Sequence, residues 1–470
     1  MKQISIWEEY KNKEITETKE LNNVNTDILI IGGGITGLTI AYYLKDSKKI
    51  ITIIDKSTIG SGITAKTTAK ITYLQQDIYR KLTNIHGKYI SKKYYKSQKE
   101  AINQILKIIK DNNIECDLEK VDSILFTNNN ISKLEQEKNI LETYGETTKE
   151  YKDNFIKKGY LFNNTYTFNP IKYLNSLKKI VKPKVSIYEN TIATNIKKED
   201  NTYIIKTNKG MISSKIVVLA CHYPFFIIPN LFPLKTYIER EYVCSSKVKE
   251  HKNITMINID KELYSIRYYK DYLIYGSNDH RLTSKIDYWK NYQKSKEDFI
   301  KYFNKKPIYL WMNQDIISND KLPFIGNLKN NLYISTAYNT WGMTNATIGG
   351  KIISDLILEK ENEYIDLFNP SRINIPLIFN SFIGIFHYLK AYIESLFNIN
   401  NPHYIKIKGI TYGIYIDKEG KIHKIKLLCP HMKCHLVFNK QEKTWDCPCH
   451  GSRFDLDGNI INTPSTKNIS

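Results

Sequence analysis

The sequence predicts a doubly wound α/β domain that is joined to an α+β domain and followed by a small all-β domain. Three observations predict this fold class. Near the N-terminus, an apolar run ends in a glycine-rich turn and is followed by helical spacing of apolar residues. Residues 222–310 are rich in Tyr and β-branched residues with an alternating pattern. From Tyr404 onward the chain shows short strands and turns.

The α/β domain is expected to be discontinuous along the chain. Its first strand covers residues 28–31, its first helix 38–44 and its second strand 50–54. Apolar strands at 215–220 and 332–335, the latter followed by a helix over 342–358, return to the same domain. We assign 26–75, 156–221 and 315–360 to this domain, 76–155 and 222–314 to the α+β domain, 361–400 to a linker and 401–470 to the all-β domain.

The composition and charge of the chain indicate which classes of partner and which cellular location to expect. The chain has 470 residues and a formal net charge of +21. The excess of Lys is spread along the chain rather than gathered into a basic stripe, so we expect no nucleic-acid partner. The N-terminal segment is polar and lacks the apolar core of a signal peptide, which favours a cytoplasmic protein. No stretch reaches about 18 uninterrupted apolar residues, so we expect no transmembrane span.

One segment of the linker, residues 375–397, has the pattern of an amphipathic helix. Its apolar face is formed by Ile378, Phe382, Ile385, Phe386, Leu389, Ile393 and Leu396, and its opposite face by Asn380, Gly384, His387 and Glu394. We expect the apolar face to pack against the protein's own domains. The alternative is peripheral attachment to a membrane, because Phe-rich interfacial helices have the same pattern.

A dinucleotide site is predicted at the first strand–helix junction. Gly32-Gly33-Gly34-Ile35-Thr36-Gly37 matches the G-x-G-x-x-G motif, with Asp55 about 20 residues further on. Gly32 permits the tight turn, Gly34 lets the backbone approach a pyrophosphate, and Gly37 allows the helix and strand to pack. The helix N-terminus then faces the anion, and Asp55 accepts a hydrogen bond from a ribose hydroxyl.

The chain after this motif resembles the D-amino-acid-oxidase and glycine-oxidase superfamily of flavoproteins, over nearly all of residues 26–360. The resemblance lies in a Gly- and Thr-rich loop at 60–70 and in Asp320-Lys321-Leu322-Pro323-Phe324-Ile325-Gly326, followed by a strand and a helix that begins at Trp341-Gly342-Met343-Thr344. It implies a Rossmann-like domain that binds FAD rather than NAD, with the last helix N-terminus facing the flavin. Ala337 departs from the family pattern, because relatives usually have Gly there.

The motif and the resemblance together imply a set of FAD-binding residues. These are Gly32, Gly34, Ile35, Thr36, Gly37, Asp55, Lys56, Gly62, Thr67, Thr68, Gly326, Gly342, Met343 and Thr344.

Four of the seven cysteines crowd together near the C-terminal end. Cys429, Cys434, Cys447 and Cys449 lie among three histidines, His431, His435 and His450, which indicates a metal site. The C-x-H and C-x-C-H spacings offer tetrahedral ligands, so a structural zinc site is one interpretation.

The same residues resemble the two boxes of Rieske proteins, which we favour because the full spacing and the Gly451-Ser452 tail fit. The resemblance implies a [2Fe–2S] cluster held by Cys429, His431, Cys447 and His450. It also implies a disulfide between Cys434 and Cys449 and a hydrogen bond from Ser452 to a cluster sulfur. In such a cluster two thiolates hold one iron and two imidazoles hold the other, which raises the potential above that of plant-type ferredoxins.

The C-terminal boxes depart from the family pattern in informative ways. Lys433 stands where many relatives have Gly, and Thr463-Pro464-Ser465 replaces a more usual Gly-Pro-Ala. Phe454 stands where quinol-oxidising Rieske proteins carry Tyr, which removes a hydrogen bond to a ligand sulfur and predicts a lower potential. No mononuclear iron triad is evident, which disfavours oxygenase chemistry.

A flavoprotein joined to a Rieske domain resembles a bacterial group of FAD-dependent oxidoreductases. The resemblance implies dehydrogenation of an amine or amino-acid-like substrate, with electrons passing from flavin to cluster and on to a further acceptor. The alternative is an electron-transfer or redox-sensing protein that has no small-metabolite substrate. Arg267 is a candidate for holding a substrate carboxylate, although a surface position is equally compatible with its pattern. Tyr242 and His280 are the other candidates for the substrate site.

Overall fold

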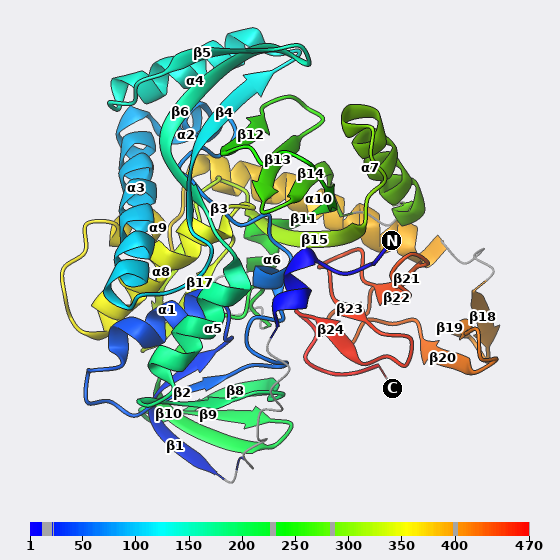
Figure 1. The fold of residues 1–470 in the computed structure, drawn as a ribbon. Helices are drawn as coiled ribbons and strands as arrows, with labels where there is room; N and C mark the ends of the chain where they lie inside the picture. Colours follow the sequence, from blue (N-terminus) through cyan, green and yellow to red (C-terminus); the bar gives the residue numbers. More distant parts are fainter. Residues whose placement is uncertain (12–20, 22, 226–231, 283–286, 398–402, 470) are drawn as a thin grey trace.

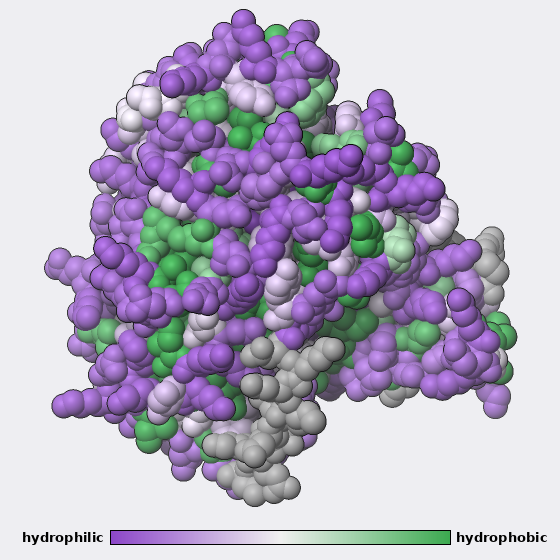
Figure 2. Space-filling model, viewed as in Figure 1, coloured by the Kyte–Doolittle hydropathy of each residue, from purple (hydrophilic) through white to green (hydrophobic). Residues whose placement is uncertain are grey.

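The structure, a computed structural model, describes residues 1–11, 21, 23–225, 232–282, 287–397 and 403–469. Two large sheets and their helices form the body of the molecule, and two small sheets near the C-terminal end lie against its side (Figure 1). The predicted fold class is therefore confirmed: a Rossmann-like α/β domain, an α+β domain and a C-terminal all-β domain. The face of the molecule in Figure 2 is mainly hydrophilic.

The first sheet has eight strands in the order β16-β17-β10-β1-β2-β7, with β8 and β9 extending it from β10. Strand β1 runs parallel to both β10 and β2 and places Ile28 opposite Ile216 and Ile51. Ile28 and Ile30 face the core formed with α1, α5 and α8, whereas Leu29 packs on the opposite face. The strands are β1 (Val24–Ile31), β2 (Ile51–Ile54), β7 (Val185–Tyr188), β8 (Ala193–Glu199), β9 (Thr202–Thr207), β10 (Gly210–Leu219), β16 (Phe324–Lys329) and β17 (Leu332–Thr336).

The second sheet has nine strands in the order β15-β11-β14-β13-β12-β4-β6-β3, with β5 paired to β6. Residues 156–167, assigned from sequence to the α/β domain, lie here instead, because they pair antiparallel with β4. The α/β domain resumes only at α5. The strands are β3 (Lys70–Ile71), β4 (Glu119–Thr127), β5 (Lys149–Asp153), β6 (Ile156–Thr167), β11 (Thr236–Lys247), β12 (Ile254–Asn258), β13 (Tyr264–Tyr269), β14 (Tyr272–Arg281) and β15 (Tyr309–Ser318).

Helices cover both large sheets (Figure 1). They are η1 (Ile6–Tyr10), α1 (Ile35–Leu44), η2 (Ile63–Ala65), α2 (Ile78–His86), α3 (Lys88–Asp111), α4 (Ile131–Thr143), α5 (Pro170–Val181), α6 (Phe232–Lys235), α7 (Tyr288–Phe303), α8 (Gly342–Ile357), α9 (Ile365–Phe368) and α10 (Ile375–Phe397). Within the described ranges, no helix is both long enough and apolar enough to cross a membrane.

The C-terminal domain consists of two small antiparallel sheets around a compact core. Trp445 is fully buried and lies against Gly413, where a side chain would come within 2.4 Å of the indole ring. A glycine is therefore required at that position for the two sheets to approach. The strands are β18 (Tyr404–Ile407), β19 (Ile410–Ile416), β20 (Ile422–Lys426), β21 (Val437–Asn439), β22 (Thr444–Asp446), β23 (Arg453–Phe454) and β24 (Ile460–Asn462).

Helix α10 lies in the opposite orientation to the one predicted from its pattern. Its polar and small residues face the protein, and its apolar face is exposed, with Phe382 and Phe386 each 67% accessible. The expectation that the apolar face packs against the protein's own domains is therefore wrong. The reason is that the surface beneath the helix offers the carbonyl oxygens of Asn319 and Thr236, which accept hydrogen bonds from the polar side of α10, and the Asn319 side-chain amide, which donates to Ser381 Oγ at 3.5 Å.

Candidate cofactor and substrate sites

The glycine-rich turn after β1 is packed so tightly that its glycines are required. Gly32 has φ +113°, and a Cβ on it would lie 2.4 Å from the carbonyl oxygen of Ala220. A Cβ on Gly37 would lie 1.9 Å from the carbonyl oxygen of Gly32. At Gly34, by contrast, the nearest protein atom would be Thr64 Oγ1 at 3.4 Å. The backbone at Gly34 is therefore open to a ligand, as a pyrophosphate cradle requires.

Asp55 ends β2 beside this turn. Its carboxylate accepts hydrogen bonds from the backbone N–H groups of Gly33, at 2.8 Å, and Ser57, at 2.9 Å. Burial raises the pKa of Asp55 above its usual value, while the two N–H groups act in the opposite direction. The side chain thus stands at the end of the second strand, where a ribose acceptor is expected.

A large cavity of about 440 Å³ extends from this turn along the sheet edge. Its volume is in the range of cofactor and ligand sites. The expected FAD-binding residues that line it are Gly32, Gly34, Ile35, Thr36, Asp55, Lys56, Gly62, Thr67, Gly342 and Met343. Thr68 and Thr344 line a second, smaller cavity.

Among the described residues, two of the expected FAD-binding residues, Gly37 and Gly326, line neither cavity. Gly37 allows α1 to pack closely against the turn, because a Cβ at this position would collide with the carbonyl oxygen of Gly32. Gly326 has φ +139° and lies in β16, where a Cβ would approach Pro370 at 3.1 Å. In the same stretch, Asp320 is buried in a bidentate ion pair with Arg372, at 2.7 and 2.8 Å. This stretch therefore anchors the chain that leads into α10 rather than lining the cavity.

The loop at 60–70 is fixed by side chains from distant parts of the chain. The indole N–H groups of Trp7 and Trp311 donate to the carbonyl oxygens of Thr67, at 2.6 Å, and Lys66, at 2.9 Å. Arg267 donates to the carbonyl oxygens of Thr68 and Ala69, at 2.8 and 2.7 Å, and of Phe168, at 3.2 Å.

These contacts change the interpretation of Arg267. Its side chain is fully buried, so the surface alternative is wrong, and it lines neither cavity described here. Nε and Nη1 of its guanidinium donate to backbone carbonyls, Nη2 has no partner among the described residues, and the group packs over the ring of Trp7 at 5.4 Å. Arg267 therefore positions the loop, and it lines neither cavity in which a substrate carboxylate is expected.

The C-terminal domain contributes one wall of the large cavity. Ile460, Ile461, Asn462, Thr463, Ser465 and Thr466 line it, opposite Thr191 and Ala193 of the α/β domain. Lys56, on the other side, donates a hydrogen bond from Nζ to the carbonyl oxygen of Ile461. Sequence reasoning missed this wall, because no local pattern links residues about 400 positions apart.

A small cavity of about 50 Å³ adjoins the large one at Thr67, Thr340, Gly342 and Met343, which line both. Three charged side chains from different strands line it: Lys70 of β3, Glu241 of β11 and Asp279 of β14. Burial lowers the pKa of Lys70 to about 7, even though Glu241 acts to raise it. Burial raises the pKa of Glu241 to about 6, against the opposing effect of Lys70.

Asp279 completes this charged group. Burial, and then the charge of Glu241, raises its pKa well above the usual value. Its Oδ1 is buried without a hydrogen-bond partner in the described part of the chain. Lys70 Nζ donates to Thr68 Oγ1 and Ser265 Oγ, each at 2.9 Å. Ionisable groups with pKa values near neutrality are suited to proton transfer, so this cavity is the best candidate for a reaction site.

Tyr242 and His280 lie together, but away from both cavities. Their rings stack at 5.6 Å, and Tyr242 also contacts Tyr292 at 4.6 Å. Burial lowers the pKa of His280 to about 4. Tyr292 donates a hydrogen bond to Glu442 of the C-terminal domain, so this cluster belongs to the contact between domains.

The four expected cluster ligands converge at one end of the C-terminal domain. The rings of His431 and His450 lie 5.1 Å apart, and the Cys429 and Cys447 thiols are hydrogen-bonded to each other. The Nδ1 atoms of both histidines are buried without a partner among the described residues. Such orphaned nitrogen atoms, facing two free thiols, fit the two-Cys, two-His donor set of a Rieske cluster.

The protonation states of three of the four residues also suit metal ligands, whereas the hydrogen bond with Cys429 and burial raise the pKa of the Cys447 thiol above its usual value. The hydrogen bond with Cys447 lowers the pKa of the Cys429 thiol to about 7, and the N–H groups of His431 and Met432 and the Ser452 hydroxyl act in the same direction. Burial lowers the pKa of His431 to about 4 and that of His450 to about 3. The imidazoles are therefore neutral near pH 7, as ligation requires.

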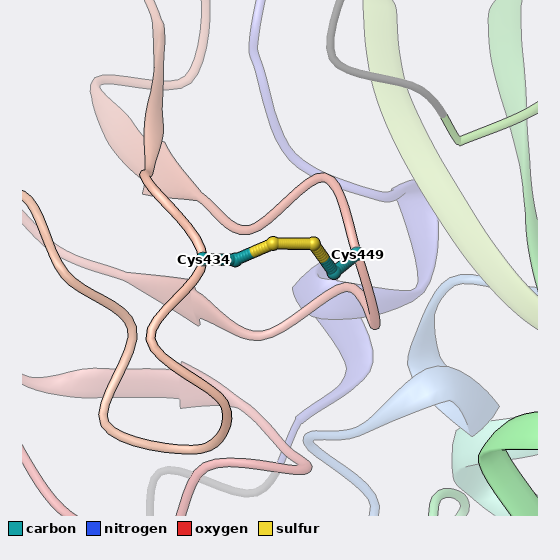
Figure 3. The surroundings of a disulfide bond; sticks show 2 residues. All are labelled: Cys434 and Cys449. Atoms are coloured by element: carbon teal, nitrogen blue, oxygen red, sulfur yellow. A yellow bond between two sulfur atoms is a disulfide. The ribbon is translucent and has the colours of Figure 1, made fainter. Parts of the chain in front are cut away.

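The disulfide between Cys434 and Cys449 is present, with the Cα atoms 6.6 Å apart. Figure 3 shows the two side chains reaching toward each other from neighbouring loops. The sulfur atoms of Cys434, Cys447 and Cys449 lie within 4.8 Å of one another, a spacing that also suits one metal ion. Because Cys434 and Cys449 are bonded to each other, they are not thiolates, and this group of three cysteines is not a metal site.

The structure also accounts for two departures from the family patterns. Lys433 and Ala337 each have φ +59°, the left-handed conformation that glycine adopts most readily. At both positions the chain therefore adopts a backbone conformation that favours glycine, although it carries another residue there.

Comparison with known proteins agrees with this geometry. The family model "FAD dependent oxidoreductase" matches residues 27–356, and the model "Rieske [2Fe-2S] domain" matches residues 388–470. The Rieske 2Fe-2S iron-sulfur protein YhfW of Bacillus subtilis (strain 168) is 29% identical over 469 residues, covering 94% of this chain and 92% of the relative. Gamma-glutamylputrescine oxidoreductase of Escherichia coli (strain K12) is 20% identical, covering 74% of this chain and 86% of the relative.

Solved structures share the fold of the two large domains. Glycine oxidase from Geobacillus kaustophilus superposes with a TM-score of 0.62 at 13% identity, over 75% of this chain and 100% of that chain. L-proline dehydrogenase from P. horikoshii superposes with a TM-score of 0.61 at 19% identity, over 75% of this chain and 98% of that chain.

Proposed function

Because the chain belongs to the FAD-dependent oxidoreductase family and carries a Rieske [2Fe–2S] domain, we propose that it dehydrogenates a cationic amine and passes the electrons from FAD to the cluster. The observation that carries the proposal is the small cavity beside the large one, with two buried carboxylates and one lysine on its walls. FAD, when bound, accepts two electrons as a hydride and can release them singly.

In this proposal the large cavity holds FAD. The backbone at Gly32 and Gly34 and the N-terminus of α1 receive the pyrophosphate, and Asp55 receives a ribose hydroxyl. The N-terminus of α8, at Gly342, adjoins the small cavity and stabilises negative charge there. Cys429, Cys447, His431 and His450 hold the cluster.

The charges of the small cavity favour an amine over an α-amino acid. Glu241 and Asp279 give the cavity two acidic groups against the single base Lys70, and Arg267, the candidate for binding a carboxylate, lines neither cavity. An ammonium group can donate to the orphaned Asp279 Oδ1 and pair with the Glu241 carboxylate, whereas a substrate carboxylate would be repelled by Glu241. Among the relatives, gamma-glutamylputrescine oxidoreductase has a name that specifies an amine substrate.

Glu241 is the proposed proton acceptor. A hydride leaves an amine only when the nitrogen lone pair is free, so the ammonium group must first lose a proton. With a pKa of about 6, Glu241 is a carboxylate near pH 7 and is close enough to neutrality to accept that proton. Asp279 then holds the nitrogen, and Lys70 limits the net negative charge of the cavity.

The test is anaerobic mixing of the purified protein with a series of primary and secondary amines, α-amino acids and alcohols, while the flavin absorbance is recorded. We expect bleaching with an amine, and roughly 100-fold slower bleaching in Glu241→Gln. Glu262→Gln removes the same charge from an exposed side chain near the cavity and serves as the matched control. If no compound bleaches the flavin, yet chemically reduced flavin still reduces the cluster, the electron-transfer alternative is favoured instead.

A further inference from the structure

Helix α10 presents a continuous apolar stripe to solvent. The stripe follows helical spacing over more than five turns, and its side chains are between 41% and 83% exposed. Its members are Ile375, Ile378, Phe379, Phe382, Ile383, Phe386, Leu389 and Ile393. On the face shown in Figure 2, by comparison, apolar residues form small separate patches in a mainly hydrophilic surface. A stripe of this kind marks an interaction site.

The helix cannot simply roll over to bury the stripe, because its inner face is specifically bonded. Asn380 donates to the carbonyl oxygen of Asn319 at 2.9 Å, and Tyr388 donates to that of Thr236 at 2.6 Å. Gly384 lies over the carbonyl oxygen of Leu234, where a Cβ would be 3.7 Å away. Polar and small residues thus fix the helix on the protein, and its apolar side faces outward.

The start of the helix is held equally firmly. Arg372, just before α10, forms the buried bidentate pair with Asp320, and Asn374 donates to the same carboxylate at 3.0 Å. Asn374 also accepts from the backbone N–H of Leu377 at 2.7 Å, which caps the first turn. The exposed stripe is therefore a defined feature of the fold and not the result of a loosely attached helix.

We propose that the outer face of α10 docks onto a lipid bilayer with anionic headgroups, with the helix axis lying in the plane of the interface. The size and residue types of the stripe fit the acyl boundary, since three Phe side chains and five Ile or Leu side chains point the same way. The helix is not of the kind that crosses a membrane. A position along the interface is the remaining arrangement that buries one face of a fixed helix in lipid.

Charge favours an anionic surface over a second copy of the chain. Each chain carries a formal net charge of +21, so two copies repel each other, whereas anionic lipid attracts the protein. Just beyond α10, residues 403–426 contain six Lys and only two acidic residues. The same stretch exposes Ile405, Ile407, Ile416 and Ile422, so it combines apolar and cationic side chains in the segment that follows the helix in the sequence. This combination matches lipid headgroups and acyl chains.

Docking of α10 onto a bilayer would also place the proposed cluster close to the membrane surface. Tyr388, on the inner side of α10, stacks on the ring of His450 at 4.7 Å. The bilayer would then lie about one helix diameter, ~10 Å, from a cluster ligand. An electron acceptor that resides in the membrane would be within reach of the cluster in this arrangement.

The experiment is flotation of the full-length protein, with both cofactors bound, through a density gradient with vesicles. The vesicles contain phosphatidylcholine alone or phosphatidylcholine mixed with phosphatidylglycerol. We expect the protein to float with the anionic vesicles and less with the neutral ones. The Phe382→Glu/Phe386→Glu variant should lose at least tenfold in partitioning, with an unchanged flavin spectrum as the check of folding.

The matched control is Met211→Glu/Trp289→Glu, which places the same charges at two exposed apolar positions on other elements. This variant should float like the wild type. The proposal is overturned if the wild type does not float with anionic vesicles, or if the α10 variant floats as well as the control. It is also overturned if sedimentation shows a dimer that the α10 substitutions abolish, because the stripe would then be covered by a second copy.

Discussion

Asp446→Asn tests whether a buried charge pair holds the Rieske domain against the flavoprotein body. Asp446 of β22 and Arg240 of β11 are both fully buried, and Arg240 Nη1 donates to Asp446 Oδ2 at 2.8 Å. The other carboxylate oxygen accepts from Arg453 Nε at 3.1 Å and from Thr444 Oγ1 at 2.8 Å. The substitution keeps the shape of the side chain but leaves two buried guanidinium groups without this negative charge.

The expected loss of stability can be estimated in two ways. Removing one partner of a buried ion pair costs about 3–5 kcal/mol. Independently, although burial acts to raise the pKa of Asp446, the charges of Arg453 and Arg240 hold it at about 2, against an ordinary value of 3.8. At ~1.4 kcal/mol per pKa unit, the difference between 3.8 and about 2 corresponds to about 2–3 kcal/mol. The expected loss of stability is therefore about 2–5 kcal/mol.

The pH dependence has a definite sign. A lowered folded-state pKa means that this contribution is fully present above about pH 4 and is lost as the pH falls toward 2. Unfolding of the wild type and of Asp446→Asn should therefore differ near neutral pH and converge in acid. The assay is urea unfolding followed separately at the flavin absorbance and at the visible circular dichroism of the cluster.

The matched control is Glu419→Gln, which removes one charge from an exposed position in the same domain. It should leave both transitions unchanged, whereas Asp446→Asn should lower the midpoint and slow electron transfer from flavin to cluster. An Asp446→Asn protein whose transitions match those of the control would refute the reasoning, because the pair would then contribute nothing to docking.

Three further predictions follow from single side chains. Gly37→Ala should abolish FAD retention after gel filtration, because its Cβ would lie 1.9 Å from a backbone oxygen, whereas Gly384→Ala, which lines neither cavity and would meet its nearest atom at 3.7 Å, should retain it. Arg267→Ala should lower stability by about 3 kcal/mol and weaken FAD binding, because three backbone carbonyls lose their donor; a selective rise in substrate KM would contradict this positioning role. Phe454→Tyr should raise the cluster potential in a redox titration of the whole chain, because an added hydroxyl can donate to a ligand sulfur; an unchanged or lower potential would argue against it.

The parts of the sites that could be predicted from sequence are those whose residues are close together in the chain. The glycine turn needs Gly32 and Gly37 within six positions, and each cluster ligand pair lies within one short loop. The charged cavity could not be found in this way, because Lys70, Glu241 and Asp279 come from three strands that only the second sheet brings together. The sequence offered one signal for this cavity, namely a charged residue at an inward-facing position of an otherwise apolar strand.

The orientation of α10 was missed for a related reason. Periodicity identifies two faces of a helix but not which face meets the protein, since this depends on the surface beneath it. Here that surface presents the carbonyl oxygens of Asn319 and Thr236, which accept hydrogen bonds from Asn380 and Tyr388 of α10 and which apolar side chains could not satisfy. The same limit applies to Arg267, whose partners lie in a loop about 200 residues away.

The position of the Rieske domain is coupled to the cofactor that it is proposed to serve. Its loop at 460–466 forms a wall of the large cavity, and Lys56 bonds the carbonyl oxygen of Ile461 from the opposite side. A ligand that fills this cavity contacts both domains, so it binds the docked arrangement more tightly than an undocked one. Because of this linkage, bound FAD would stabilise the docked arrangement of the two domains by the difference between its binding free energies for the docked and the undocked arrangement. Domains joined by a chain segment move relative to each other by default unless their interface is extensive. In the proposed arrangement the flavin nucleotide would be part of that interface and would hold the cluster at a fixed distance from the flavin.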